Sequence, residues 1–181
     1  MSVDLEQQMV DLQKRMSKLE NRNNDQLSMV VFSGEMDKIL AAMIIATGAT
    51  AMDSKVKMFF TFWAIASLRD AKKKAKGKDF MSKMFGMMLP HGRNKLKLSN
   101  MNMGGMGPAM IKSLMKKKNV ASLDELFAAA AELGVEICIC EMSMNLMGFK
   151  KDEMIDYPHL SYCGVGTFLA DADESSVQLF I

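Results

Sequence analysis

The stretch "VEICICEMSMNLMGF", residues 135–149, decides the fold. It begins with a short apolar run containing β-branched residues, which is typical of a buried strand. A methionine-rich segment of helical character follows at once, and Gly148 can end it. A strand that leads directly into a helix is the repeating unit of a parallel α/β sheet. Two cysteines, Cys138 and Cys140, lie at the end of this strand.

The rest of the chain repeats this alternation. A capping-box pattern, Ser122 with Glu125, opens one helix, and Gly134 ends it. Asp37 is expected to cap another. Strands are predicted over 27–34, 55–63, 135–140 and 176–181, and a short one at the start of 160–175. Further helices are predicted over 38–53 and 64–77. The pattern predicts an α/β fold with a mainly parallel sheet and helices on both faces.

A separate helix is predicted before this domain, over 2–24. Apolar residues recur there at alternating steps of four and three, which forms an a/d seam for a coiled coil or for packing on the domain: Leu5, Met9, Leu12, Met16 and Leu19. The polar run "NRNNDQ" then acts as a linker. We therefore divide the chain into an N-terminal helix, 1–26, and an α/β domain, 27–181.

The interval 78–110 interrupts the alternation as an insert. Its first part predicts a helix with Phe80, Met84 and Met88 on one face, ended by Pro90, and "NMNMGGMGP" is expected to form a loop. The wider segment 72–118 carries a charge of +12, against −10 for the remainder. Methionine suits surfaces that repack against different partners. We interpret the insert as a lid or a docking hairpin, or as a solvated basic segment.

Composition limits the class of protein. The 181 residues suit one domain, almost half are apolar, and no apolar stretch is long enough to span a bilayer. The first 27 residues lack the pattern of a signal peptide, so a cytoplasmic location is expected. Three cysteines, an odd number in a reducing compartment, argue against a disulfide framework.

The working crevice of such a sheet lies beyond the carboxyl ends of its strands. Cys140 is the candidate catalytic residue, because a thiol at the start of a helix meets unpaired N–H groups that favour thiolate. The alternative is that Cys140, like Cys138, fills the core as a small hydrophobe. The residues expected to line the pocket are Ser33, Gly34, Thr61, Trp63, Met142, Ser143 and Cys163.

Several stretches resemble the DsrE/DsrF-like family, in its subgroup of sulfurtransferases and predicted peroxiredoxins. The most specific is the run C-E-M-S-M-N-L-M-G after an apolar strand. The resembling segments are "GEMDKILAAMIIATGATAMDSKVKMFFTFW" (34–63), "NMNMGGMGPAM" (100–110), "GVEICICEMSMNLMGF" (134–149), "DEMID" (152–156) and "GVGTFLADADESSVQLFI" (164–181). The N-terminal helix lies outside the resemblance.

The resemblance implies a flavodoxin-like three-layer fold and a homo-oligomer, a trimer or hexamer. It also implies a sulfur-carrier role in which Cys140 holds persulfide sulfur and exchanges it with sulfur-donor and sulfur-acceptor thiol proteins. A peroxidase role would need Cys163 as the resolving thiol.

Two other functions remain open. Soft ligands could bind Cu(I), namely Cys138, Cys140, Met101, Met103, Met142, Met144 and His91. Alternatively, the chain is a non-enzymatic oligomer that docks on a protein, or peripherally on a membrane through 78–110. His91 and His159 are expected to face solvent. No nucleic-acid partner, metal or cofactor is expected, because the lysines lack a reading motif and no dinucleotide or Walker motif occurs.

Overall fold

The computed structural model describes residues 2–20, 25–73 and 80–181, with the side chains of the first helix described over 7–17. Five strands form one sheet in the order β4-β3-β2-β1-β5, and every pairing is parallel. The strands are β1 (Gln26–Val31), β2 (Lys55–Phe60), β3 (Glu136–Cys140), β4 (Leu160–Cys163) and β5 (Val177–Phe180). The prediction of a parallel α/β sheet is confirmed.

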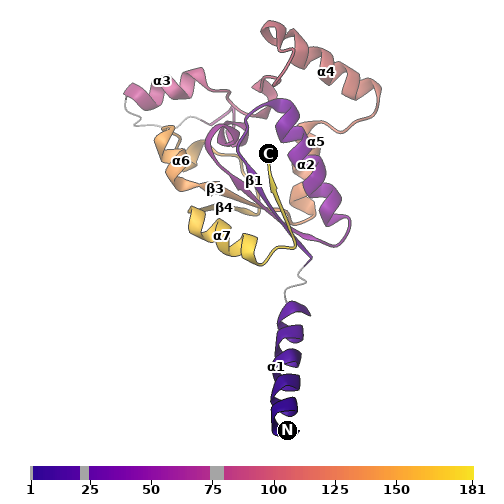
Figure 1. The fold of residues 1–181 in the computed structure, drawn as a ribbon. Coiled ribbons are helices and arrows are strands. Elements are labelled where there is room, and N and C mark those ends of the chain that lie inside the picture. The colour runs from indigo at the N-terminus through magenta and orange to yellow at the C-terminus, as the bar shows by residue number, and fades with distance from the viewer. Residues whose placement is uncertain (1, 21–24, 74–79) are drawn as a thin grey trace.

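Helices cover both faces of the sheet (Figure 1). On one face α2 (Met36–Thr50) packs beside α5 (Leu123–Glu132), and on the other lies α7 (Val165–Asp173). The short helix α6 (Glu141–Leu146) follows β3 at the carboxyl edge of the sheet. This arrangement is the three-layer, flavodoxin-like architecture that the resemblance implied.

The main core lies between the sheet and the α2–α5 layer. Alternate strand residues point into it, including Met29, Met58 and Ile137, all of them almost fully buried. Ile39 and Phe127 meet them from the two helices. The sheet face toward α7 is different, because it buries the polar side chains of β1 and β2 described below.

Local signals explain most element boundaries. The Ser122 hydroxyl accepts a hydrogen bond from the Glu125 N–H, and the Glu125 carboxylate accepts one from the Ser122 N–H. The predicted capping box therefore forms. The role given to Asp37 was wrong, because Glu35 is the N-cap of α2 and the Asp37 carboxylate accepts hydrogen bonds from Ser99.

Two predictions about the segments around the insert are also wrong. The helix expected over 64–77 is a 3₁₀-helix, η1 (Phe62–Leu68), after which Arg69 forms an isolated bridge with Met154. Residues 74–77 of that prediction lie outside the described residues. The loop expected in "NMNMGGMGP" ends early, because the short η3 (Met103–Gly105) leads directly into α4 (Met106–Lys117).

The insert itself carries the predicted helix as α3 (Phe80–Met88), followed by the single turn η2 (Arg93–Lys95). A second single turn, η4 (Lys151–Glu153), follows α6. Helices α3 and α4 extend beyond the same end of the domain (Figure 1). Within the described ranges, no helix is both long enough and apolar enough to cross a bilayer.

The first helix, α1 (Ser2–Glu20), extends away from the α/β domain at the opposite end (Figure 1). Met9, Leu12 and Met16 of the predicted seam are each more than half exposed. The side chains of Leu5 and Leu19 lie outside the described residues, as do residues 21–24 of the linker. The described part of the seam is therefore not covered by the chain's own domain.

Candidate functional site

The carboxyl ends of β2 and β3 bring three polar side chains together. Cys140 ends β3 and is also the N-cap residue of α6. Thr61 follows β2, and Ser143 lies in the first turn of α6. The hydroxyl oxygens of Thr61 and Ser143 are 2.8 Å apart and hydrogen-bonded. Two adjacent strands and one helix therefore place a hydroxyl pair beside the thiol.

This surrounding favours the thiolate form of Cys140. Burial alone raises the pKa of the thiol, but hydrogen bonds lower it below its ordinary value. The side chain and the N–H of Ser143 contribute to this lowering of the pKa, and so do the Thr61 hydroxyl and the Met142 N–H. A thiolate is the nucleophilic form of cysteine, so these hydrogen bonds favour the form of Cys140 that sulfur chemistry requires.

The Cys140 side chain is nevertheless buried, with 4% of its surface exposed. Its hydrogen-bonding neighbours Thr61 and Ser143 are buried as well, so polar groups adjoin the buried thiol. Two side chains expected around it lie at the surface, Met142 at 61% and Trp63 at 47% exposed. The thiol is therefore closed to solvent, and a sulfur donor reaches it only after neighbouring groups move.

Ser33 and Gly34 lie beyond the end of β1, as expected. The Ser33 N–H donates to the Ile181 carbonyl at 3.2 Å. A Cβ on Gly34 would lie 2.5 Å from the Trp63 carbonyl oxygen, so only glycine permits this approach of the two loops. These residues shape the carboxyl edge of the sheet beside β2, while the hydrogen bonds to Cys140 come from Thr61, Met142 and Ser143.

The carboxylate next to the thiol has its own partner. Glu141 accepts a hydrogen bond from Lys151 Nζ at 2.7 Å, and the same ammonium lies 4.4 Å from the centre of the Tyr162 ring. Lys151 of η4 therefore offsets the charge of the carboxylate that follows Cys140.

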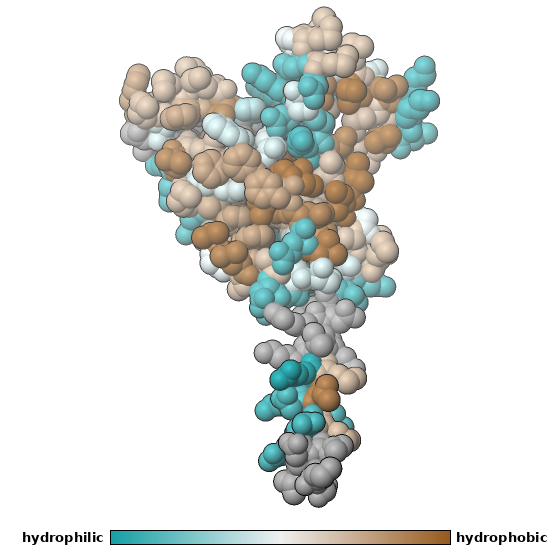
Figure 2. Space-filling model, in the orientation of Figure 1, coloured by the Kyte–Doolittle hydropathy of each residue, from teal (hydrophilic) through white to brown (hydrophobic). Residues whose placement is uncertain are grey.

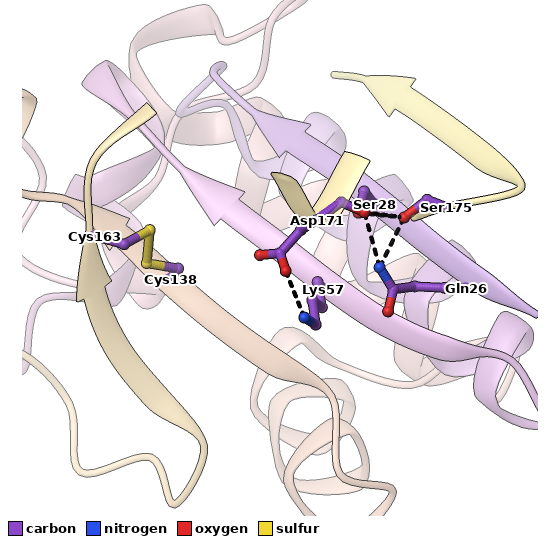
Figure 3. A network of polar contacts seen from close by, with 7 residues as sticks. All are labelled: Gln26, Ser28, Lys57, Cys138, Cys163, Asp171 and Ser175. Atoms are coloured by element: carbon purple, nitrogen blue, oxygen red, sulfur yellow. Dashed lines mark hydrogen bonds and ion pairs between the residues drawn. A yellow bond between two sulfur atoms is a disulfide. The ribbon is translucent and has the colours of Figure 1, made fainter. Parts of the chain in front are cut away.

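Cys163 is joined to Cys138 by a disulfide, which overturns the expectation that the cysteines stay unpaired (Figure 3). The two Cα atoms are 6.1 Å apart on neighbouring strands. Cys140 is the free cysteine and, in the strand register, pairs directly with Cys163.

The Cu(I) hypothesis loses the Cys138–Cys140 ligand pair, because Cys138 is bonded to the sulfur of Cys163. Across the described ranges, no group of three or more His, Cys, Asp or Glu residues is placed to hold a metal ion.

A polar network holds α7 on the same face of the sheet (Figure 3). Lys57 Nζ forms an ion pair with Asp171, and this hydrogen bond raises the pKa of Lys57. Gln26 donates to the Asp171 carbonyl and to the Ser175 hydroxyl, each at 2.9 Å, and Ser28 lies 2.7 Å from the same hydroxyl. The polar residues of β1 therefore have partners on and after α7.

A buried arginine anchors the insert next to the site. Arg69, 2% exposed, pairs with Glu153 at 3.1 Å and donates to the carbonyls of Gly86 and Pro90. It also contacts His91, which is partly buried instead of facing solvent as expected. His159 is exposed, as expected.

Helix α3 packs on the end of α6. A Cβ on Gly148 would lie 2.3 Å from the Ser82 hydroxyl oxygen, so this contact is close. Large apolar side chains on these two helices remain exposed and form what we call the α3–α6 surface, consisting of Phe80, Met81, Met87, Met88, Met142 and Leu146. Figure 2 shows how apolar residues gather over this end of the domain. The helix that begins at Cys140 therefore contributes to an apolar surface.

Comparison with known families agrees with this geometry. A model of the DsrE/DsrF/DrsH-like family matches residues 23–180. The chain belongs to this family. The match leaves out the whole of α1, as the sequence resemblance did.

Two relatives extend the comparison. The chain is 48% identical over 154 residues to the uncharacterized protein YrkE of Bacillus subtilis, covering 85% of this chain and 95% of that protein. It is 34% identical over 159 residues to the sulfur carrier protein DsrE2 of Allochromatium vinosum, covering 86% of this chain and 97% of that protein. Sulfur transfer in general is therefore the function that the family relationship indicates.

Some parts of this DsrE-like site had no local signal in the sequence. Arg69 lay within a run assigned to a helix, and its partners come from the insert and η4. The Cys138–Cys163 bond depends on β4 lying beside β3, which the order of elements along the chain does not reveal. The polar residues Ser28 and Lys57 on otherwise apolar strands were a usable signal for a polar layer under α7.

Proposed function

We propose that this DsrE-like protein is a sulfur carrier in which Cys140 holds persulfide sulfur. The observation that carries the proposal is the position of a free cysteine at the junction of β3 and α6, beside the hydrogen-bonded hydroxyls of Thr61 and Ser143. Family membership and a relative named as a sulfur carrier support it. The Thr61 and Ser143 hydroxyls hold the sulfur in its anionic form.

The transfer has two symmetrical steps and no net oxidation. The Cys140 thiolate attacks the outer sulfur of a donor persulfide, the donor S–S bond breaks, and the donor leaves as a thiolate. An acceptor thiolate then attacks the outer sulfur on Cys140, and Cys140 leaves as the thiolate. Hydrogen bonds from Ser143 and Thr61 stabilise the Cys140 thiolate, which is the nucleophile of the first step and the leaving group of the second.

Burial of the thiol implies that partners must open the site. We propose that donor and acceptor thiol proteins dock on the α3–α6 surface, where exposed methionines adapt to different shapes. Arg69 holds the end of α3 through the Gly86 carbonyl, so a partner bound to the α3–α6 surface contacts the helix that begins at Cys140. Peripheral contact of 78–110 with an anionic membrane is the competing use of this surface, and liposome sedimentation distinguishes the two.

Assembly and location complete the proposal. The exposed seam of α1, with Met9, Leu12 and Met16, supports self-association of this helix within a trimer or hexamer. A cytoplasmic location agrees with partners whose thiols stay reduced. Sedimentation velocity of the full chain and of a form lacking residues 1–20 tests whether α1 carries the association.

Transfer to an acceptor thiol tests the function. The protein is loaded with glutathione persulfide, freed of excess donor and mixed with a small thiol, and sulfane sulfur is then measured on both by cyanolysis. We expect one transferable sulfur per chain in the disulfide form of the wild type and none in Cys140→Ser. The double variant Cys138→Ser/Cys163→Ser is the control, and it should load like the disulfide form of the wild type. Equal loading of Cys140→Ser contradicts the proposal.

A further inference from the structure

We propose that Cys138 and Cys163 form a dithiol–disulfide couple that reduces the persulfide on Cys140 to sulfide. The redox state of this pair would then decide whether sulfur is passed to a partner or released. The proposal rests on the sulfur-carrier function of Cys140 and adds a second activity to it. The placement of all three cysteines on two neighbouring strands carries it.

Strand geometry puts the three sulfurs on one face of the sheet. Side chains two residues apart in a strand point the same way, so Cys138 and Cys140 share a face. Cys163 is the register partner of Cys140 and the disulfide partner of Cys138. Directly paired residues on one face are near neighbours. Cys163 is therefore the thiol that can exchange with both of the others.

The chemistry balances without an outside oxidant. With the pair reduced, the Cys163 thiolate attacks the outer sulfur on Cys140, and Cys140 leaves as the thiolate. The Cys138 thiolate then attacks Sγ of the Cys163 persulfide, forms the Cys138–Cys163 bond and expels HS⁻. Two thiols are oxidised to a disulfide, and one sulfane sulfur is reduced to sulfide. The two thiol protons leave with the sulfide or with solvent.

The environments of the three sulfurs suit these roles. Hydroxyls and N–H groups adjoin Cys140 and lower its pKa, which makes it the better leaving group in the first step. Cys138 and Cys163 are bonded to each other. Both are partly exposed and line a cavity of about 170 Å³ between the sheet and α7.

This cavity gives the pair its own access. Besides the two sulfurs, it is lined by Lys57 and Phe59 of β2 and by Phe168 of α7, among others. Cys140 does not line it. An external dithiol reductant can therefore reach the disulfide without passing the carrier site, and this reductant restores the dithiol by thiol–disulfide exchange.

A purely structural role for the disulfide is the alternative. Strands β3 and β4 are already paired through Ile137, Cys138, Ile139 and Cys140, so the covalent bond joins strands that the sheet holds together. In a reducing compartment, disulfides are usually catalytic or redox-sensing. Both points favour a reversible couple.

The test compares the two redox forms of the wild-type chain. It needs no substitution, so misfolding of a variant cannot affect the result. Reduced and disulfide forms are prepared anaerobically, each receives one equivalent of glutathione persulfide, and intact mass and free sulfide are followed with time. In the disulfide form, the added sulfur should persist on the protein. In the reduced form, it should disappear as the protein loses two hydrogen atoms and one equivalent of sulfide appears.

Three variants locate the steps. Cys163→Ser should retain the added sulfur on Cys140. Cys138→Ser should carry the added sulfur on Cys163 as well as on Cys140. Cys140→Ser should neither take up the sulfur nor form the Cys138–Cys163 disulfide. Equal persistence of the sulfur in both redox forms overturns the proposal, and so does oxidation of the pair in Cys140→Ser. Failure of the disulfide form to load at all refutes the carrier function instead, so the two failures are distinguishable.

Discussion

Replacing Ser143 by alanine removes the hydroxyl that hydrogen-bonds to the Cys140 sulfur while leaving the backbone N–H in place. A hydrogen bond to a charged group contributes about 1.5–3 kcal/mol. At a pH below the thiol pKa, its loss lowers the thiolate population by about 10- to 100-fold. Each remaining thiolate is more nucleophilic, because nucleophilicity rises with the pKa of the thiol. This gain offsets about half of the loss in thiolate population on a logarithmic scale. We therefore expect Ser143→Ala to react about 3- to 10-fold more slowly at a pH below the thiol pKa.

Alkylation by iodoacetamide measures this change. In the disulfide form Cys140 is the free cysteine, so the rate reports a single residue. The pH at which the rate levels off should move upward in Ser143→Ala. Ser54→Ala makes the same chemical change at the amino end of β2 and should leave the profile unaltered. A Ser143→Ala profile that superimposes on the wild type, in a protein of unchanged circular dichroism, refutes the account of the thiolate.

Three further predictions follow from buried contacts and titration. Arg69→Ala removes the ion pair between Arg69 and the buried Glu153 carboxylate and should lower the unfolding free energy in urea by about 3–5 kcal/mol. A loss below about 1 kcal/mol would contradict a buried ion pair at this position. Gly34→Ala should destabilise the fold, because its Cβ would lie 2.5 Å from the Trp63 carbonyl oxygen. Gly48→Ala, in an open part of α2, should instead stabilise the fold by about 0.5–1 kcal/mol. Equal melting temperatures of these two variants would contradict the close approach at Gly34. Since folding lowers the pKa of Cys140, its thiolate adds stability that is fully present above the unfolded pKa of about 8.5 and is lost as the pH falls through the folded pKa. The difference in unfolding free energy between the wild type and Cys140→Ser should therefore grow as the pH rises between the folded and unfolded pKa values. A difference that shrinks as the pH rises would contradict the lowered pKa of Cys140.

Sequence reasoning succeeded where local patterns determine the structure. Ser122 and Glu125 specify a helix start through contacts three residues apart, and the apolar run before Cys140 specifies a strand followed by a helix. These signals act within one turn or one strand. Together with the family resemblance, they predicted the sheet, its layers and the position of Cys140 at the strand end.

It failed where distant contacts override local preference. The segment after Leu68 leaves its helical course because Arg69 is buried among carbonyls of the insert and paired with Glu153. Helix α4 was missed because glycines and Pro108 suggested a loop. Pro108 lies in the first turn of that helix, where no intrahelical N–H bond is required.

The disulfide shows the same limit. Cys138 and Cys163 are 25 positions apart, and only the adjacency of β3 and β4 brings them within bonding distance. The spacing of cysteines along the chain contained no such information. Burial of Cys140 likewise depends on tertiary packing, which brings Thr61 and Ser143 together beside the thiol.

Site-resolved mass spectrometry of the disulfide form after exposure to glutathione persulfide tests the carrier role most directly. Fragment ions that separate Cys140 from Cys138 should place one added sulfur atom on Cys140, and prior alkylation of Cys140 should prevent its addition. Added sulfur found only at other positions, or a Cys140 peptide of unchanged mass under conditions in which a small thiol is fully converted to its persulfide, would contradict the account.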